Sequence, residues 1–313
     1  MTRFLNQTLR GALSDPAALI VAQGCQLEEP LVGGLDAALA AAKAADIVVL
    51  AVGESRNMSG EAQSRTYIGL PPIQQILVEE VASVGKPMVV LLRHGRALAL
   101  EDSVKNAQAI LATWFLGTET GNAVADVLFG AVNPSGRLPV SFPLENGQQP
   151  YFYNHRSTGR PAPDTEDNQS FKARWRSVRN EALYPFGHGL GYAPFKLSEL
   201  ALSTNSLGWD ETLVVTATIA NQGTVTGEHV VQLYVHDRVA SRTRPVRELK
   251  GFTRVAVAPG EQRQVRFTLK REALMFIGEG DRWTVEPGWF DVWVANNSVD
   301  GLSGAFELRR RGR

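Results

Sequence analysis

The first 140 residues alternate continuous apolar runs with segments of helical periodicity. At the start, Phe4, Leu5, Leu9 and Leu13 recur at helical spacing, as expected inside an amphipathic helix. Further helical patterns cover 34–45, 73–84 and 121–129, and apolar runs expected to form strands cover 17–21, 46–52, 87–92 and 109–114. Continuous apolar strands alternating with helices are typical of a parallel sheet covered on both faces. We therefore predict an α/β domain over residues 1–140.

From about residue 196 the pattern changes to short strands, several with a period of two. The expected strands are Leu213–Ala220, His229–His236, Gln264–Leu269 and Phe290–Ala295, with turn clusters between them. This spacing predicts an antiparallel β-sandwich of the immunoglobulin-like kind over residues 196–313. Residues 141–195 form a connector rich in Pro, Gly, Asn and aromatic residues. Because free linkers carry few aromatic side chains, we expect this connector to be packed.

The composition narrows the possible functions. The 32 Lys and Arg residues balance 32 Asp and Glu residues, which argues against a polybasic binder of nucleic acid or of a membrane surface. No apolar run approaches the ~18–20 residues that would cross a bilayer. The single cysteine, Cys25, excludes an intrachain disulfide framework and a thiolate-rich metal site. The five histidines lack metal-ligand spacing, and we expect neither a metal nor another cofactor.

The loop after the run 46–52 carries the most suggestive chemistry. It contains two carboxylates, Glu54 and Glu61, and two guanidinium groups, Arg56 and Arg65. Loops after the carboxyl ends of parallel strands are where open α/β sheets bind ligands. Glu61, next to Gly60, could project from the loop and protonate a leaving oxygen if partial burial raised its pKa. The alternative, common for charged loop residues, is an ion pair with Arg56 or Arg65 in solvent.

Several ordered motifs resemble family 3 glycoside hydrolases, in particular the β-glucosidase branch related to bacterial periplasmic enzymes. They are DIVVLAVGES, SGEAQSRTYIGLPPIQQILVEEV, GKPMVVLLRHGRALAL, ATWFLGTETGNAVADVLFGAVNPSGRLPVSFP, YFYNHRSTGRP and LYPFGHGLGY. The resemblance covers essentially the whole chain. It implies the carboxyl-side half of such an enzyme: most of an α/β sandwich domain, without its amino-terminal part and first strand, followed by a fibronectin type III-like domain.

The resemblance also implies a mechanism with two carboxylates on different domains. The family's nucleophile is an Asp in an amino-terminal (β/α)8 barrel, and its general acid/base Glu falls on Glu61, with Glu54 as the less favoured alternative. Ser64 and Arg65 match residues that shape this loop and are candidates for substrate binding. The only Ser-Asp pair, Ser14-Asp15, precedes Pro16 and is expected to form a turn. We therefore expect the chain to supply one of two catalytic carboxylates and to be inactive without the barrel.

The expected partners are a β-glucoside or β-linked oligosaccharide and a family 3 barrel, in cis or in trans, with homo-oligomerisation possible. The resemblance implies a periplasmic or secreted enzyme, although the chain carries no signal peptide. An alternative function is a non-catalytic carbohydrate-binding or assembly module. A third, an independent hydrolase that uses Glu61, Glu54 or Ser64, is disfavoured because no GxSxG motif occurs.

Two further features have structural and functional interpretations. Trp289 and Trp293 lie on one face of an expected strand and, with Trp283, could stack on a sugar; we expect them to pack in the sandwich core instead. His94, directly after an expected strand, is expected to be a hydrogen-bonded structural group.

Overall fold

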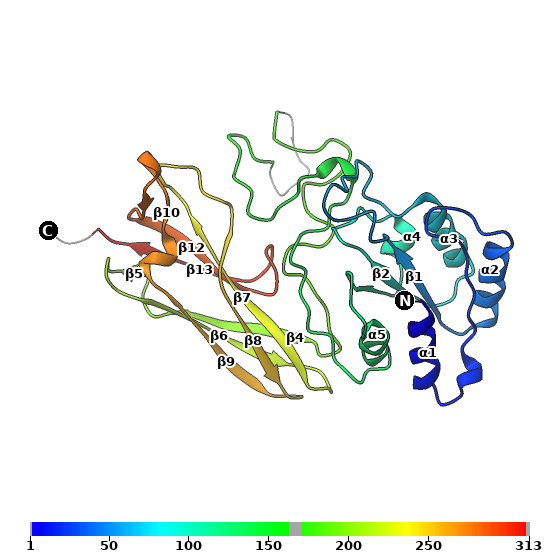
Figure 1. Ribbon diagram of the computed structural model, residues 1–313. Coiled ribbons are helices and arrows are strands. Elements are labelled where there is room, and N and C mark those ends of the chain that lie inside the picture. The colour runs from blue at the N-terminus through cyan, green and yellow to red at the C-terminus, as the bar shows by residue number, and fades with distance from the viewer. Residues whose placement is uncertain (1, 163–170, 311–313) are drawn as a thin grey trace. The chain divides into compact units, whose positions relative to one another are not determined.

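The computed structural model describes residues 2–162 and 171–310, which form two compact units (Figure 1). The first unit contains the described residues up to 132 together with 142–149, and the second contains 133–141 and the described residues from 150 onward. The chain thus leaves the first unit, returns to it for one short segment and then completes the second unit.

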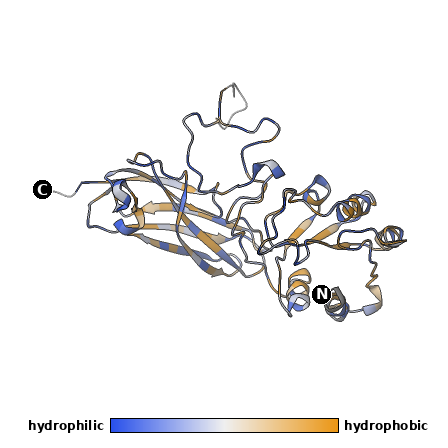
Figure 2. Ribbon diagram, turned by 45° about the horizontal axis from the view of Figure 1, so that its top comes forward, coloured by the Kyte–Doolittle hydropathy of each residue, from blue (hydrophilic) through white to orange (hydrophobic). Residues whose placement is uncertain are grey.

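The first unit is built on a three-stranded parallel sheet in the order β1-β2-β3. Its strands are β1 (Val48–Gly53), β2 (Met88–Arg93) and β3 (Ala109–Ala112), and its helices are α1 (Thr2–Ala12), α2 (Gly34–Ala44), α3 (Pro72–Ser83), α4 (Asp102–Lys105) and α5 (Thr120–Leu128), with short 3-10 turns η1 (Pro16–Ala18) and η2 (Asn146–Gln148). Helices α1 and α5 lie on one side of the sheet, and α2 and α3 on the other (Figures 1 and 2). The predicted α/β architecture is confirmed. None of the described helices is long and apolar enough to span a membrane.

The amino-terminal helix packs through the residues that its periodicity indicated. Leu5 and Leu9 are buried against Val124 and Ala125 of α5 and Leu91 of β2. Burial of each such leucine stabilises the fold by ~1.5–3 kcal/mol. The hydrophobic spacing therefore attaches α1 to the sheet through α5.

The strand predicted over residues 17–21 is absent. Asp15 accepts a hydrogen bond from the backbone N–H of Ala17 at 2.9 Å and caps η1, which confirms the predicted turn at Ser14-Asp15-Pro16. Ile20 and Val21 remain about half exposed, because no strand pairs with this segment among the described residues. Strand β1 is likewise an edge strand, and Val49 on it is 41% exposed.

The second unit is a β-sandwich that confirms the predicted fibronectin type III-like fold, and its strands pair antiparallel except for the parallel pair β5 and β13. One sheet has the order β5-β13-β12-β7-β8 and the other β4-β6-β9. The strands are β4 (Phe195–Leu202), β5 (Ser206–Leu207), β6 (Leu213–Asn221), β7 (Gly227–Asp237), β8 (Glu248–Val257), β9 (Gln262–Leu269), β12 (Gly288–Ala295) and β13 (Leu302–Leu308); the small hairpin β10 (Phe276–Ile277) and β11 (Trp283–Thr284) and the 3-10 turns η3 (Arg271–Leu274) and η4 (Glu279–Asp281) lie between β9 and β12.

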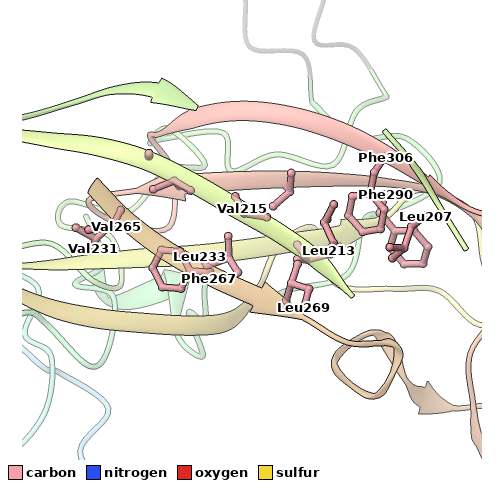
Figure 3. Packing of buried hydrophobic residues seen from close by; sticks show 14 of the residues in the cluster. Leu207, Leu213, Val215, Val231, Leu233, Val265, Phe267, Leu269, Phe290 and Phe306 are labelled. Atoms are coloured by element: carbon pink, nitrogen blue, oxygen red, sulfur yellow. The ribbon is translucent and has the colours of Figure 1, made fainter. Parts of the chain in front are cut away.

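Alternating residues of the facing strands build the core between the two sheets. Figure 3 shows Leu213 and Val215 of β6 in this core together with Phe290 of β12 and Phe306 of β13. The two phenylalanine rings stack with their centroids 5.3 Å apart. The period of two on β6 and β12 therefore reports which face of each strand is inside.

The same alternation places the tryptophans on the outside, so the expectation that they pack in the core is wrong. Phe290 and Val292 occupy the inward positions of β12, which leaves Trp289 and Trp293 on the outer face. Trp289 is 45% exposed, and Trp283 is 67% exposed. The guanidinium group of Arg238 lies over the ring of Trp289 at 5.7 Å, and that of Arg247 over the ring of Trp293 at 4.2 Å.

Part of the connector covers the outer face of β7. Tyr153 stacks on Phe186 with ring centroids 4.3 Å apart and accepts a hydrogen bond from the N–H of Leu249. The amide of Gln232 on β7 donates to the carbonyl of Gly187 at 3.1 Å. Gly187 has φ +81°, and a Cβ there would lie 2.1 Å from the Gln232 side chain, so only glycine fits. Strand β7 is consequently buried on both faces, as the full burial of Tyr234 shows.

His229 on β7 is expected to make the stability of this sandwich sensitive to mild acid. Its Nδ1 accepts from Arg137 and its Nε2 donates to Asn296, each at 2.8 Å, so the ring is neutral. Burial, reinforced by the Arg137 charge, lowers the pKa of His229 to about 4. The unfolded chain binds this proton near pH 6.5, so stability falls as the pH drops from ~6.5 to ~4, by on the order of 3 kcal/mol. In thermal unfolding measured across this pH range, the Tm of His229→Gln should fall less steeply with decreasing pH than the Tm of the unsubstituted chain. His155→Gln, at an exposed histidine, is the control. Equal slopes of Tm against pH for His229→Gln and the unsubstituted chain would contradict the assignment.

Asp237 is expected to have the opposite effect on the stability of the sandwich, which it should lower as the pH rises. Its side chain is buried, Oδ1 accepts from the N–H of Val239 at 3.3 Å, and Oδ2 has no hydrogen-bond partner among the described residues. Burial raises the pKa of Asp237 to about 6. The folded state therefore favours the protonated carboxyl group. Its contribution to the free energy of unfolding is complete below ~pH 3.8 and is lost as the pH rises through about 6. We expect Asp237→Asn to raise Tm at pH 8 and to change it little at pH 4; a Tm at pH 8 equal to or below that of the unsubstituted chain would refute this.

Candidate active-site loop

Loops that follow the three parallel strands meet at the carboxyl-terminal edge of the sheet. The contact centres on Gly95, just after β2, where a Cβ would lie 2.2 Å from Oγ of Ser59 and 2.6 Å from the ring of Phe115. Ser59 follows β1 and Phe115 follows β3. These loops therefore form one surface at the edge where open parallel sheets bind ligands.

The chain leaves β1 at a tightly constrained point. Gly53 has φ +140°, and a Cβ there would lie 1.8 Å from the carbonyl oxygen of Arg93, so a side chain is excluded. The buried side chain of Gln74 accepts from the N–H of Gly53 at 2.7 Å and donates to its carbonyl at 3.0 Å. The N–H of Glu54 donates to Arg93 at 2.7 Å. Together these bonds determine where the loop begins.

Glu54 is buried at the base of the loop. Its Oε1 lies 2.7 Å from Nη1 of Arg65 and 3.1 Å from Nε of Arg96, and its Oε2 accepts from the N–H of Gly95 at 3.0 Å. The carboxylate side chain is fully inaccessible to solvent. Two cations and one backbone donor compensate this buried charge. Glu54, the alternative acid/base candidate, therefore has no exposed oxygen to offer a substrate.

Glu61 lies at the opposite extreme, exposed on the loop tip. It stands between Gly60, with φ +130°, and Ala62, whose φ of +58° is in the left-handed region that non-glycine residues seldom adopt. Strain of this kind clusters at functional sites. The Glu61 side chain makes no hydrogen bond or ion pair with another described residue, so the alternative that it pairs with Arg56 or Arg65 is wrong.

Arginine side chains attach the remainder of the loop to the domain. Nη2 of Arg96 donates to the carbonyl of Met58 and, at 2.8 Å, to that of Gln63. Nη2 of Arg65 donates to the carbonyl of Gly69 at 3.2 Å. Arg65 is thus engaged by Glu54 and Gly69, whereas Ser64 is exposed. Sequence reasoning did not single out Arg96, although its place three residues after β2 puts it at the same sheet edge as Glu61.

His94 supports this surface from inside the domain. It is fully buried, its ring centroid lies 4.3 Å from that of Trp114 and 5.4 Å from that of Phe142, and its Nδ1 donates to the carbonyl of Arg96 at 2.8 Å. Burial lowers the pKa of His94 and favours the neutral ring. The expectation of a hydrogen-bonded structural group is confirmed. Within residues 2–162 and 171–310, no group of three or more His, Cys, Asp or Glu side chains could hold a metal ion.

Comparison with known proteins agrees with this architecture. The profile of the glycosyl hydrolase family 3 C-terminal domain matches residues 6–192, and that of the fibronectin type III-like domain matches residues 229–298. The chain is 44% identical over 274 residues to a periplasmic β-glucosidase of Salmonella typhimurium, covering 88% of this chain and 36% of that protein. It is 38% identical over 295 residues to a β-xylosidase of Formosa agariphila, covering 94% of this chain and 40% of that protein.

Solved structures give the same result. A β-glucosidase from Listeria innocua in complex with glucose superposes with a TM-score of 0.87 at 38% identity, over 91% of this chain and 40% of that one. A β-glucosidase from Erythrobacter marinus gives a TM-score of 0.88 at 30% identity, over 98% of this chain and 43% of that one. The chain spans about two fifths of the length of these relatives. With most of its length matched by the family's carboxyl-terminal domain, the chain belongs to glycosyl hydrolase family 3.

Proposed function

We propose that this chain is the carboxyl-side part of a retaining β-glucosidase and that Glu61 is its general acid/base. The supporting observation is the contrast between the two carboxylates of one loop in a family 3 chain. Glu54 is buried and fully engaged, whereas Glu61 is exposed, without a partner among the described residues, and carried by a strained turn. Only Glu61 can approach a substrate held by another domain.

The proposed chemistry divides the reaction between two domains. Glu61 protonates the glycosidic oxygen as the aglycone leaves, while a carboxylate on the barrel attacks the sugar and forms a covalent glycosyl-enzyme. Glu61 then removes a proton from the water that releases the sugar. Retention requires the two carboxyl groups to be about 5–5.5 Å apart. The barrel must therefore bring its nucleophile to the tip of the Glu61 loop.

The open edge of the sheet is consistent with a larger assembly. Strand β1 has no partner on its outer side among the described residues, and Ile47 and Val49 beside that edge are 60% and 41% exposed. Unpaired strand edges of this kind readily pair with another segment. A strand from the remainder of the enzyme, in cis or in trans, would complete the sheet.

The relatives narrow the proposed substrate. They include enzymes named for β-glucosides and for β-xylosides, and the periplasmic β-glucosidase has the higher identity of the two described, 44% against 38%. We therefore propose terminal β-D-glucosyl residues as the substrate and the periplasm as the compartment.

The isolated chain is expected to fold without hydrolysing p-nitrophenyl β-D-glucoside, because it supplies one of the two carboxylates. The measurement is release of p-nitrophenol by the purified chain, after circular dichroism has shown that it is folded. Addition of a family 3 barrel fragment should restore turnover if the two parts associate. Turnover by the repurified chain alone would refute the division of the site between domains.

In an enzyme assembled with its barrel, Glu61→Ala is expected to lower kcat by about 10²–10⁴-fold, as is typical for loss of a general acid/base. Azide, a small nucleophile that needs no general base, should partly restore turnover and give a glucosyl azide product. Gln63→Ala, a change at an exposed neighbour on the same loop, serves as the control. Unchanged kcat in Glu61→Ala would exclude the assigned role, and sugar affinity without turnover would favour the carbohydrate-binding module.

A further inference from the structure

We propose that Arg96 is a positioning residue that holds the tip of the catalytic loop, and that buried Glu54 is the anchor that holds Arg96. The contacts stand independently of catalysis, whereas the effect on turnover rests on the proposed role of Glu61. The proposal gives Glu54, which is unable to reach a substrate, a function in the same site.

Arg96 binds two backbone carbonyl groups, one on either side of Glu61. Its Nη2 donates to Met58, three residues before Glu61, and at 2.8 Å to Gln63, two residues after Glu61. One nitrogen therefore closes the loop across the residues that carry the carboxylate. The buried side chain of Met58 adds a second attachment, and its Sδ accepts from the N–H of Ser55 at 3.4 Å.

Two cations share one anion beneath the loop. The side chains of Arg65 and Arg96 are only 19% and 24% exposed, and both approach the same oxygen of Glu54, at 2.7 and 3.1 Å. Without the Glu54 charge, two partly buried cations would repel each other at close range. Glu54 thus keeps both arginines in place, and Arg65 extends the attachment to Gly69 beyond the loop.

The guanidinium group of Arg96 is suited to bind Glu54 and the loop at the same time. Arginine presents several N–H donors in a rigid planar fork, so one edge can approach Glu54 while another binds the loop carbonyls. A lysine has a single nitrogen on a flexible chain. Arg96→Lys would retain the positive charge near Glu54 but could not reproduce both sets of contacts. The substitution therefore separates positioning from charge.

The first experiment uses the chain alone and needs no activity. A glutamyl endopeptidase cleaves after Glu61 only when the loop tip opens to fit the protease, so the cleavage rate measures how firmly the tip is held. We expect Arg96→Lys to accelerate this cut about tenfold or more, as measured by intact-mass spectrometry of the digest over time. Arg56→Lys is the matched control, because Arg56 is exposed on the same loop and makes no hydrogen bond or ion pair with a described residue.

A second variant distinguishes local release of the loop from general loss of folding. Glu54→Gln keeps the side-chain shape but removes the charge, and it should accelerate the same cut while leaving cleavage in the β-sandwich unchanged. Equal rates at Glu61 in Arg96→Lys, Glu54→Gln and the unsubstituted chain would overturn the proposal. Acceleration in Arg56→Lys equal to that in Arg96→Lys would overturn it as well.

The second experiment measures turnover by the enzyme assembled with its barrel. Misplacement of a catalytic group by ~1 Å can cost about 10²-fold, so Arg96→Lys should lower kcat by up to that factor with KM changed less than about threefold. In the Glu61→Ala background the same substitution should have little further effect, because the group being positioned is gone. Additive losses would overturn the positioning role. Glu61→Ala alone tests the proposed function, so the two failures are distinguishable.

Discussion

The buried carboxylate of Glu54 is the interaction on which the organisation of the proposed site depends. A charge that is fully withdrawn from solvent is tolerated only when it is paired and hydrogen-bonded. Here Arg65 and the N–H of Gly95 donate hydrogen bonds to it, and Arg96 adds a second ion pair. Removal of one partner from such a buried pair typically costs about 3–5 kcal/mol. Glycines on either side of this ion pair allow the close approach: a Cβ at Gly53 would meet the backbone of Arg93, and a Cβ at Gly95 would meet the side chains of Ser59 and Phe115. Glu61 can remain exposed because its loop is attached elsewhere.

The division of roles between two glutamates seven residues apart has a physical basis in solvation. Glu54 lies where the chain has just left the sheet, so neighbouring strands and loops exclude water from it. Glu61 lies between the Met58 and Gln63 carbonyls that Arg96 binds, and its side chain keeps its contact with solvent. A general acid must reach its substrate, and in the proposed function that substrate is held by another domain. Stability and reactivity are therefore assigned to different carboxylates of the same loop.

The β-sandwich uses another solution to the problem of buried polar groups. Gln232 and Tyr234 on the outer face of β7 are covered by residues of the connector, and the Gln232 amide donates to the Gly187 carbonyl. His229 is satisfied at both ring nitrogens as a neutral imidazole, whereas one oxygen of buried Asp237 has no partner among the described residues. Of these two groups, His229 therefore lowers the stability of the sandwich in mild acid, and Asp237 lowers it near neutral pH.

The sequence alone determined the elements whose stability is local or periodic. The spacing of apolar residues predicts the helices near 34–45 and 73–84, the parallel strands of the first unit and the alternation on β6. It does so because an element that buries one face carries apolar residues at the period of that element. The sequence motifs also indicated the loop that carries Glu61.

Tertiary structure decided the rest. The apolar run 17–21 did not form a strand, because a strand needs a partner that no local pattern supplies. Trp289 and Trp293 share one face, as their spacing required, but only the packing of Phe290 against Phe306 shows that this face is outside. Glu54 and Arg96 stand 42 residues apart, and only the register of β1 against β2 brings their charges together.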